Sequence, residues 1–174
     1  MCYLNGNLIA RNGQRIGVAD GEPSNRKLPG VSLDNACYNV VAGNIFAGNY
    51  GSGVKAVRSS CRNIITVNEF ASNNAGINSV HHFFGVELAS DLKRDYEGAA
   101  GMDFAPCYEN AVFANCITGG HSSGVYLGEG DARNAIKDNF ISGFLSKGIE
   151  DNSTDASNEI KHSAAPGEAG GFRV

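Results

Sequence analysis

Residues 39–46 read NVVAGNIF, with Asn39 and Asn44 five positions apart and each followed two positions later by a large apolar residue. The arrangement returns 24 residues later as NIITVNEF at 63–70, and again as NAVFANCI at 110–117 and NAIKDNFI at 134–141. A partial copy begins at Asn158 and Ile160. A fixed period of this length predicts one structural unit stacked on copies of itself.

A glycine followed by an apolar residue recurs on the same period. The pairs are Gly53-Val54, Gly76-Ile77, Gly101-Met102, Gly124-Val125 and Gly148-Ile149, at spacings of 23 to 25 residues. This schedule predicts a further, degenerate copy at Val86, Leu88 and Asp91, within the 47-residue gap between Asn63 and Asn110. At the N-terminus the equivalent pair is Gly17-Val18, with Gly30-Val31 as a competing placement.

Composition excludes several classes of function. Charged residues make up 18% of the 174 residues and the net charge is −4, with no basic stripe, which argues against nucleic acid as a partner. The chain has no run of 18 apolar residues that would predict a membrane span, and residues 1–11 show no signal peptide. The five cysteines lack zinc-ligand spacing, so no metal or cofactor is predicted. Cys37 and Cys61 lie 24 residues apart, as two buried thiols or as a disulfide.

Each period holds three short apolar segments, represented by Val41, Phe46 and Val54, and no segment shows a sustained helical period. Asn44 separates the first two segments. Asn tolerates left-handed backbone at a bend, and stacked Asn side chains can hydrogen-bond in a ladder. We therefore predict an all-β fold, a right-handed parallel β-helix of about seven coils of ~24 residues with three short strands per coil. This domain spans 1–160, and an irregular tail spans 161–174.

The Asn-x-Ile-x-x-Asn-x-Phe unit with its later Gly-Val pair resembles the coil of the pectate-lyase-like right-handed β-helix superfamily, which includes bacteriophage tailspikes and polysaccharide-degrading enzymes. The resemblance implies a polysaccharide partner, a homotrimer or stacking on the rest of a larger chain, and an extracellular or virion-surface location. The Asp-Pro-His triplet of the alginate epimerases is absent from the sequence. Neither the calcium cluster nor the catalytic arginine of pectate lyases can be placed.

Outward side chains beside the Gly-apolar pairs form one predicted ladder along the coils. Its members are Lys55, Asn78, Asp103, Tyr126 and Glu150. Asp103 and Glu150 would lie two coils apart, ~9.6 Å between backbones. Such a separation suits inverting glycoside hydrolysis, so these are the candidate catalytic residues. Lys55, Asn78 and Tyr126 are candidate carbohydrate contacts. The alternative is a face that is polar because it meets solvent.

The stretch 79–97 combines dense charge with the most eroded repeat. His82, Asp91 and Arg94 in this stretch are further candidates for carbohydrate binding, and a solvated bulge that prevents aggregation is the alternative. His121 lies in a Gly-rich segment typical of a surface turn. Glu129 and Asp131 form a weak candidate for calcium.

Three functions remain open from the sequence. The first is carbohydrate recognition of the tailspike or receptor-binding kind, with or without depolymerase activity. The second is a polysaccharide lyase, hydrolase or epimerase module. The third is a structural rod that spaces other domains.

Overall fold

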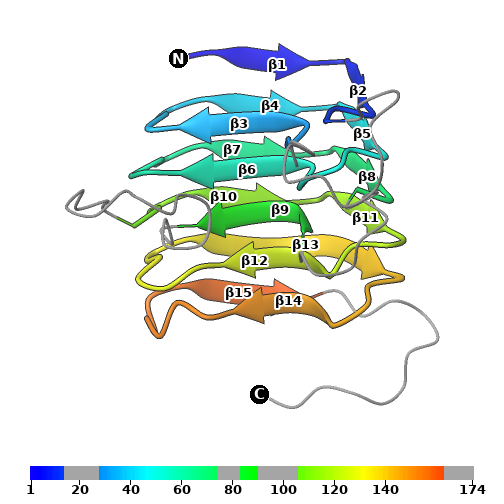
Figure 1. Cartoon of the computed structure of the whole chain (residues 1–174). Helices are drawn as coiled ribbons and strands as arrows, with labels where there is room; N and C mark the ends of the chain where they lie inside the picture. The colour runs from blue at the N-terminus through cyan, green and yellow to red at the C-terminus, as the bar shows by residue number, and fades with distance from the viewer. Residues whose placement is uncertain (14–27, 74–82, 90–105, 163–174) are drawn as a thin grey trace, which may run out of the picture.

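The computed structural model describes residues 1–13, 28–73, 83–89 and 106–162, and these residues form fifteen β-strands and no helix. The strands are β1 Tyr3–Asn5, β2 Leu8–Ala10, β3 Val31–Asp34, β4 Val40–Ala42, β5 Ile45–Ala47, β6 Val54–Val57, β7 Ile64–Thr66, β8 Glu69–Ala71, β9 Phe84–Ala89, β10 Ala111–Phe113, β11 Cys116–Thr118, β12 Ser123–Leu127, β13 Ala135–Ser142, β14 Lys147–Asp151 and β15 Glu159–His162. The chain is therefore all-β over these ranges (Figure 1).

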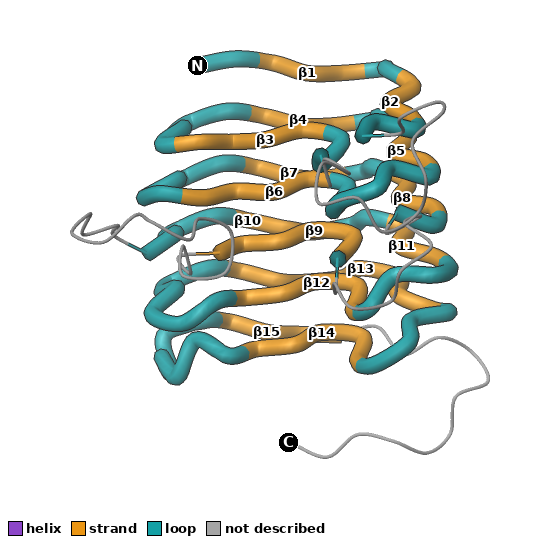
Figure 2. Tube along the Cα trace, in the orientation of Figure 1, coloured by secondary structure: helices purple, strands orange, loops and turns teal. Residues whose placement is uncertain are grey.

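The predicted seven-coil, three-strand β-helix is wrong. The fifteen strands form two parallel sheets, one of ten strands and one of five, which do not close on each other. The larger sheet runs β1-β4-β7-β10-β13-β11-β8-β5-β2, with β15 paired to β13. The smaller sheet runs β14-β12-β9-β6-β3 and lies in front of the larger one in Figure 2.

Equivalent residues of successive repeats pair in parallel, so the chain rises in layers. Val41 pairs with Ile65, 24 residues on, and Val112 pairs with Ile136 at the same interval. Across the long gap, however, Ile65 pairs directly with Val112. No layer stands between β7 and β10, so the 47-residue gap holds no hidden copy in this sheet.

The degenerate copy proposed at Val86, Leu88 and Asp91 is a misplacement. Val86 and Leu88 lie in β9 of the five-stranded sheet, where Val86 pairs with Val54 on one side and with Val125 on the other. Asp91 lies outside the described residues. At the N-terminus the competing placement is the right one, because Val31 pairs with Val54.

The core consists of the inward side chains of each layer. Val41, Phe46 and Val54 are 0–2% exposed, and their equivalents in the next layer, Ile65, Phe70 and Val86, are fully buried, whereas those in the first layer, Leu4, Ile9 and Val31, are partly buried. Phe46 and Phe70 stack face to face at 4.8 Å between ring centroids. Alternate residues of a short strand point to the same side, which explains why the inward apolar residues of a strand lie two positions apart.

Glycine precedes each buried valine of the small sheet because a side chain would not fit. A Cβ on Gly85 would lie 2.6 Å from Cγ2 of Ile117 and 2.7 Å from the carbonyl oxygen of Gly124. Gly30 is as confined, against the carbonyl oxygen of Gly53 at 2.6 Å. Gly148 in the last layer meets nothing closer than 3.5 Å. The glycines therefore let the backbone approach the neighbouring layer and its core side chain.

The predicted asparagine ladders are confirmed at the bends. Asn44 donates its backbone N–H and its side-chain Nδ2 to Oδ1 of Asn68, at 3.0 and 3.1 Å, and Asn68 does the same to Asn115. The first repeat asparagines form a parallel ladder from Asn39 through Asn63, Asn110 and Asn134 to Asn158. Most of these side chains are buried, so each ladder replaces water for the polar groups inside the bends.

The left-handed residue at each bend is the one before the asparagine, which corrects the expectation that the asparagine takes this conformation. At the second bend the residues with positive φ are Gly6, Gly43, Val67, Ala114 and Asp138. Val67 has φ of +53° and is 64% exposed. A β-branched residue in this region is strained, because its side chain crowds the backbone.

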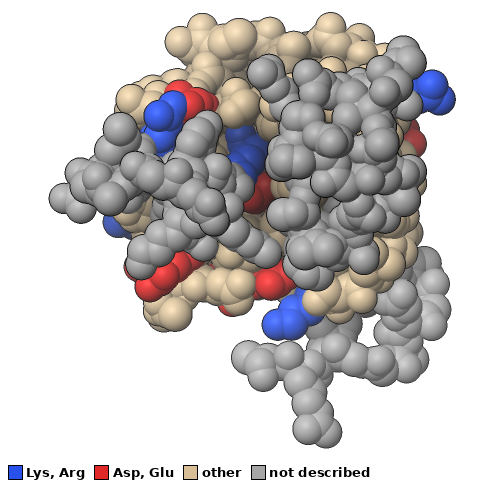
Figure 3. Space-filling model, viewed as in Figure 1, with Lys and Arg blue, Asp and Glu red and all other residues tan. Residues whose placement is uncertain are grey.

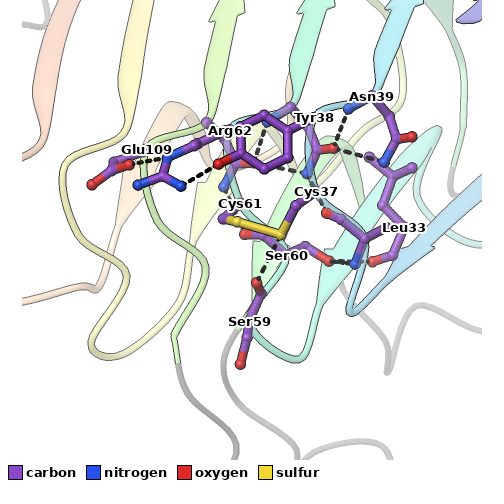
Figure 4. Close-up of a disulfide and its surroundings, with 12 residues drawn as sticks. Leu33, Cys37, Tyr38, Asn39, Ser59, Ser60, Cys61, Arg62 and Glu109 are labelled. Atoms are coloured by element: carbon purple, nitrogen blue, oxygen red, sulfur yellow. Dashed lines mark hydrogen bonds and ion pairs between the residues drawn. A yellow bond between two sulfur atoms is a disulfide. The ribbon is translucent and has the colours of Figure 1, made fainter. Parts of the chain in front are cut away.

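Cys37 and Cys61 form a disulfide between adjacent layers, with 4.6 Å between their Cα atoms. Beside it, Arg62 donates to the Tyr38 hydroxyl and to Oε2 of Glu109, the latter at 2.6 Å (Figure 4). Cys2, Cys107 and Cys116 are free thiols. The disulfide therefore joins equivalent positions of two adjacent layers, as the 24-residue separation of the two cysteines predicts.

Candidate functional site

The outward face of the five-stranded sheet brings charged and aromatic side chains into one register. Lys55 in β6 pairs with Glu87 in β9, Glu87 pairs with Tyr126 in β12, and Tyr126 pairs with Glu150 in β14. Neighbouring strands in a sheet are ~4.8 Å apart, so the four residues form a row along the stacking direction. We call Lys55, Glu87, Tyr126 and Glu150 the polar row.

Three of the predicted ladder residues therefore share one face, but the predicted order is wrong. A single layer, that of Glu87, stands between Lys55 and Tyr126, where two were predicted; Asn78 and Asp103 lie outside the described residues. The carboxylate two layers from Glu150 is Glu87. The predicted separation of Asp103 from Glu150 stays a prediction, because Asp103 lies outside the described residues.

The sequence did contain a signal for Glu87. Gly85-Val86 is a Gly-apolar pair of the same form as Gly53-Val54, and Glu87 follows it as Lys55 follows the earlier pair. The regular spacing of Gly76 and Gly101 hid this pair, because it falls off the 24-residue schedule.

Glu87 is held by a cation and a hydroxyl. Lys55 Nζ lies 3.1 Å from its Oε1, and the side chains of Lys55 and Glu87 are 15% and 7% exposed. Ser52 Oγ donates to Oε2 of Glu87 at 2.5 Å and accepts the backbone N–H of Phe84 at 3.1 Å. Burying two charges is expensive even when they are paired, so this arrangement is a costly one for an outer face.

Glu150, like Glu87, accepts a hydrogen bond from a serine hydroxyl of the preceding layer. Ser123 Oγ donates to Oε2 of Glu150 at 2.8 Å, and Asn152 Nδ2 donates to Oε1 of Glu150 at 3.3 Å. Between the two carboxylates, the ring of Tyr126 stacks on that of Phe84 with centroids 4.5 Å apart. Ser52, Phe84 and Ser123 thus reach from the residue before each glycine to the polar row of the next layer.

Figure 3 views this face of the molecule, and basic and acidic atoms lie side by side near its middle. The other predicted site residues, Asn78, His82, Asp91, Arg94 and Asp103, lie outside the described residues. Residues 74–82 and 90–105 directly precede and follow the segment that carries β9 and Glu87 in the sequence.

His121 is buried at 1% exposure, which corrects its placement in a surface turn. Its Nε2 lies 3.5 Å from the carbonyl oxygen of Phe70. Asn49 and Asn73 donate Nδ2 to the equivalent carbonyls of Ile9 and Phe46. His121 therefore takes the place of an asparagine in a third ladder. Burial lowers its pKa to about 4.

Asp131 is fully buried and serves the backbone, not calcium. Its Oδ1 accepts the N–H of Cys107 at 2.8 Å and its Oδ2 accepts the N–H of Gly128 at 2.9 Å. Burial raises the pKa of Asp131 to about 7 and that of the Cys107 thiol to about 12. Within the described ranges no group of three His, Cys, Asp or Glu side chains could hold a metal ion.

The chain matches no protein-family model, no curated protein and no solved structure. The resemblance to the pectate-lyase-like superfamily therefore stays a prediction. Across the described ranges, no helix is long and apolar enough to cross a membrane.

Proposed function

We propose that the polar row is a carbohydrate-binding surface and that its ligand is a polysaccharide. The observation that carries the proposal is the Lys55–Glu87 ion pair, which lies on the outer face of a sheet at 15% and 7% side-chain exposure and in register with Tyr126 and Glu150. Desolvated charges that the core does not require are typical of functional sites.

The chemistry of the row suits a chain of sugar hydroxyls. Carboxylates accept hydrogen bonds, the lysine donates them, and the serine and tyrosine hydroxyls do both. These groups recur at each layer, ~4.8 Å apart. A linear polymer that follows the stacking direction would meet the half-buried Lys55 and Glu150, with the buried Glu87 and Tyr126 between them in the row.

Hydrolysis is the reaction that the row supports best. Glu87 and Glu150 are two layers apart, ~9.6 Å between backbones. This backbone separation is just above the ~6.5–9.5 Å that separates the two carboxyl groups of inverting enzymes, in which one carboxyl group protonates the leaving oxygen and the other activates water. Tyr126 lies in the layer between them.

The test is retention of the purified chain on an array of neutral and acidic polysaccharides, followed by titration of any ligand found. We expect Glu150→Gln to weaken binding at least tenfold. Thr118→Ala, on β11 of the other sheet, serves as the matched control and should bind normally. Retention of no polysaccharide, or equal binding by Glu150→Gln and wild type, would overturn the proposal.

Turnover is measured separately as the release of new reducing ends from a bound polysaccharide. Glu87→Gln and Glu150→Gln should each reduce release at least a hundredfold, since each removes one of two carboxyl groups that act together. Binding without release in the wild type would leave recognition as the function and would refute hydrolysis.

The Cys37–Cys61 disulfide favours an oxidising compartment, because intracellular thiols are kept reduced in most organisms. We propose that the protein acts outside the cell or on a virion surface. Expression in reducing and oxidising compartments, with the thiols counted by alkylation, tests this.

A further inference from the structure

The Cys37–Cys61 disulfide closes one complete layer of the stack into a covalent loop. The residues between the two cysteines form β4, β5 and β6, and β6 carries Lys55 of the polar row. Cys61 is 3% exposed and Cys37 is half-buried. The cross-link therefore constrains the layer that supplies the cation of the Lys55–Glu87 ion pair.

A buried hydroxyl connects the disulfide to the strand ends (Figure 4). Ser60, the residue before the second cysteine, is fully buried, and its Oγ accepts the N–H of Ala36, the residue before the first, at 3.1 Å. The same Oγ lies 2.6 Å from the carbonyl oxygen of Val57, which ends β6, and 2.8 Å from that of Leu33 in β3. A movement of either cysteine is therefore transmitted to the strand that carries Lys55.

The turn that leads from β6 to the disulfide holds strained backbone. Arg58 and Ser59 are consecutive non-glycine residues with positive φ, at +51° and +63°. The equivalent turns after β3, β12 and β14 each have one left-handed residue, in order Asn35, Gly130 and Thr154. Strained backbone persists where the surrounding structure over-determines it, and it is characteristic of switch regions. The disulfide is the covalent constraint that holds this turn.

The ion pair of the polar row is sensitive to the position of β6. Lys55 Nζ lies 3.1 Å from Oε1 of Glu87, and both side chains are largely buried. A displacement of β6 that separates the two groups leaves a buried carboxylate without this cation, which is strongly unfavourable. A binding surface also loses affinity when one of its parts must be ordered as the ligand binds.

We propose that the Cys37–Cys61 disulfide is a redox switch that locks the polar row, so that the oxidised chain binds its ligand and the reduced chain binds it poorly. The carbohydrate nature of the ligand rests on the function proposed above, whereas the locking of β6 does not depend on it.

The switching step is a thiol–disulfide exchange. On oxidation the two cysteine thiols lose two protons and two electrons as the S–S bond forms, and a low-molecular-weight disulfide takes up both and is cleaved to two thiols. Binding is then confined to oxidising surroundings, which agrees with the location proposed above.

The first test measures amide hydrogen exchange in the oxidised protein and after reduction by a dithiol, without any ligand. A cross-link that closes a 24-residue loop makes opening of the enclosed layer on the order of a hundredfold rarer. We expect β6 and β12 to exchange at similar rates in the oxidised protein, and β6 to exchange at least tenfold faster than β12 after reduction. Retained protection of β12, two strands away in the same sheet, shows that the rest of the stack is still folded. Equal exchange of the two strands after reduction would overturn the switch, whether or not the chain binds a polysaccharide.

The second test is titration of the polysaccharide that the oxidised chain retains, before and after reduction. We expect the dissociation constant to rise at least tenfold on reduction, and the double variant Cys37→Ser, Cys61→Ser to bind as weakly as the reduced protein in both conditions. Cys116→Ser, which removes an exposed free thiol, is the matched control and should still lose affinity on reduction. An affinity that reduction leaves unchanged would refute redox control of the row. Absence of binding by the oxidised chain would refute the proposed function alone, and the exchange of β6 then decides the switch.

Discussion

Replacing His121 by asparagine should make the protein more resistant to acid. In the folded chain His121 has a pKa of about 4, against 6.5 for an ordinary histidine, because burial disfavours its charged form. As pH falls below 6.5 the unfolded chain takes up a proton that the folded chain does not, so the free energy of unfolding falls. The difference of about 2.5 pK units corresponds to a loss of about 3 kcal/mol between pH 6.5 and pH 4.

Asparagine is the right substitute because it is already present at this place in other layers. Asn49 and Asn73 donate Nδ2 to the carbonyls of Ile9 and Phe46 at 3.1 Å, and Nε2 of His121 lies 3.5 Å from the equivalent carbonyl of Phe70. His121→Asn should therefore keep the ladder contact and remove the titration. Urea unfolding of both proteins between pH 4 and pH 7.5 measures the difference.

Asp131 titrates over a similar range with the opposite sign. Its folded pKa of about 7 lies above the ordinary 3.8, so the folded state binds the extra proton between these values. The free energy of unfolding therefore rises by about 4 kcal/mol as pH falls from 7 to 4. The two effects nearly cancel in the wild type. Asp131→Asn should lose stability relative to the wild type on acidification, whereas His121→Asn should gain it.

The reasoning is refuted if His121→Asn and the wild type show parallel stability curves from pH 7 to pH 4. Parallel curves would mean that His121 is protonated in the folded state or reaches water. Opposite slopes of the two difference curves, His121→Asn against Asp131→Asn, would separate both groups from the exposed carboxylates, which are common to all three proteins.

Three further predictions concern stability. Gly124→Ala should cost about 1–3 kcal/mol through overpacking against Ile141 and the Gly148 carbonyl oxygen, whereas Gly148→Ala, whose nearest contact is 3.5 Å, should be nearly neutral in urea unfolding; equal effects would contradict the packing argument. The pair Cys37→Ser and Cys61→Ser should lose about 3 kcal/mol, the expected value for a cross-link that closes a 24-residue loop, and an unchanged midpoint would show that the disulfide does not form. Val67→Asn should raise the free energy of unfolding by about 1 kcal/mol by relieving left-handed strain; a less stable variant would show that Val67 is not strained.

The repeat predicted what depends on a single layer and its immediate neighbour. The parallel pairing of Val41 with Ile65, the inward apolar columns and the asparagine ladders all follow from equal residues at equal spacing. The stacked cysteines follow in the same way, since Cys37 and Cys61 differ by one period. Each of these features depends only on residues one period apart, and so it can be predicted from the sequence.

The predicted number of layers is wrong because the period of a sequence carries no information about which strands pair. A layer is counted by which strands pair, and Ile65 pairs with Val112 across 47 residues as readily as Val41 pairs with Ile65 across 24. A long connection leaves the strand register intact, because loop closure grows in cost only slowly with length. The even spacing of Gly76 and Gly101 in the sequence suggested an extra layer, whereas β7 pairs directly with β10 and β9 pairs with both β6 and β12.

The same miscounting of layers also led to the wrong membership of the predicted ladder. Placing Asn78 and Asp103 in the ladder excluded Glu87, whose pairing with Lys55 and Tyr126 makes the polar row continuous. The local form of Gly85-Val86 carried the correct assignment, and a steric argument supports it: this glycine faces Ile117 and the next glycine carbonyl, as Gly53 faces Phe70. Steric contact with the neighbouring layer is therefore a better criterion for a ladder position than distance along the chain. The contact is what requires a glycine, whereas a regular spacing can arise without it.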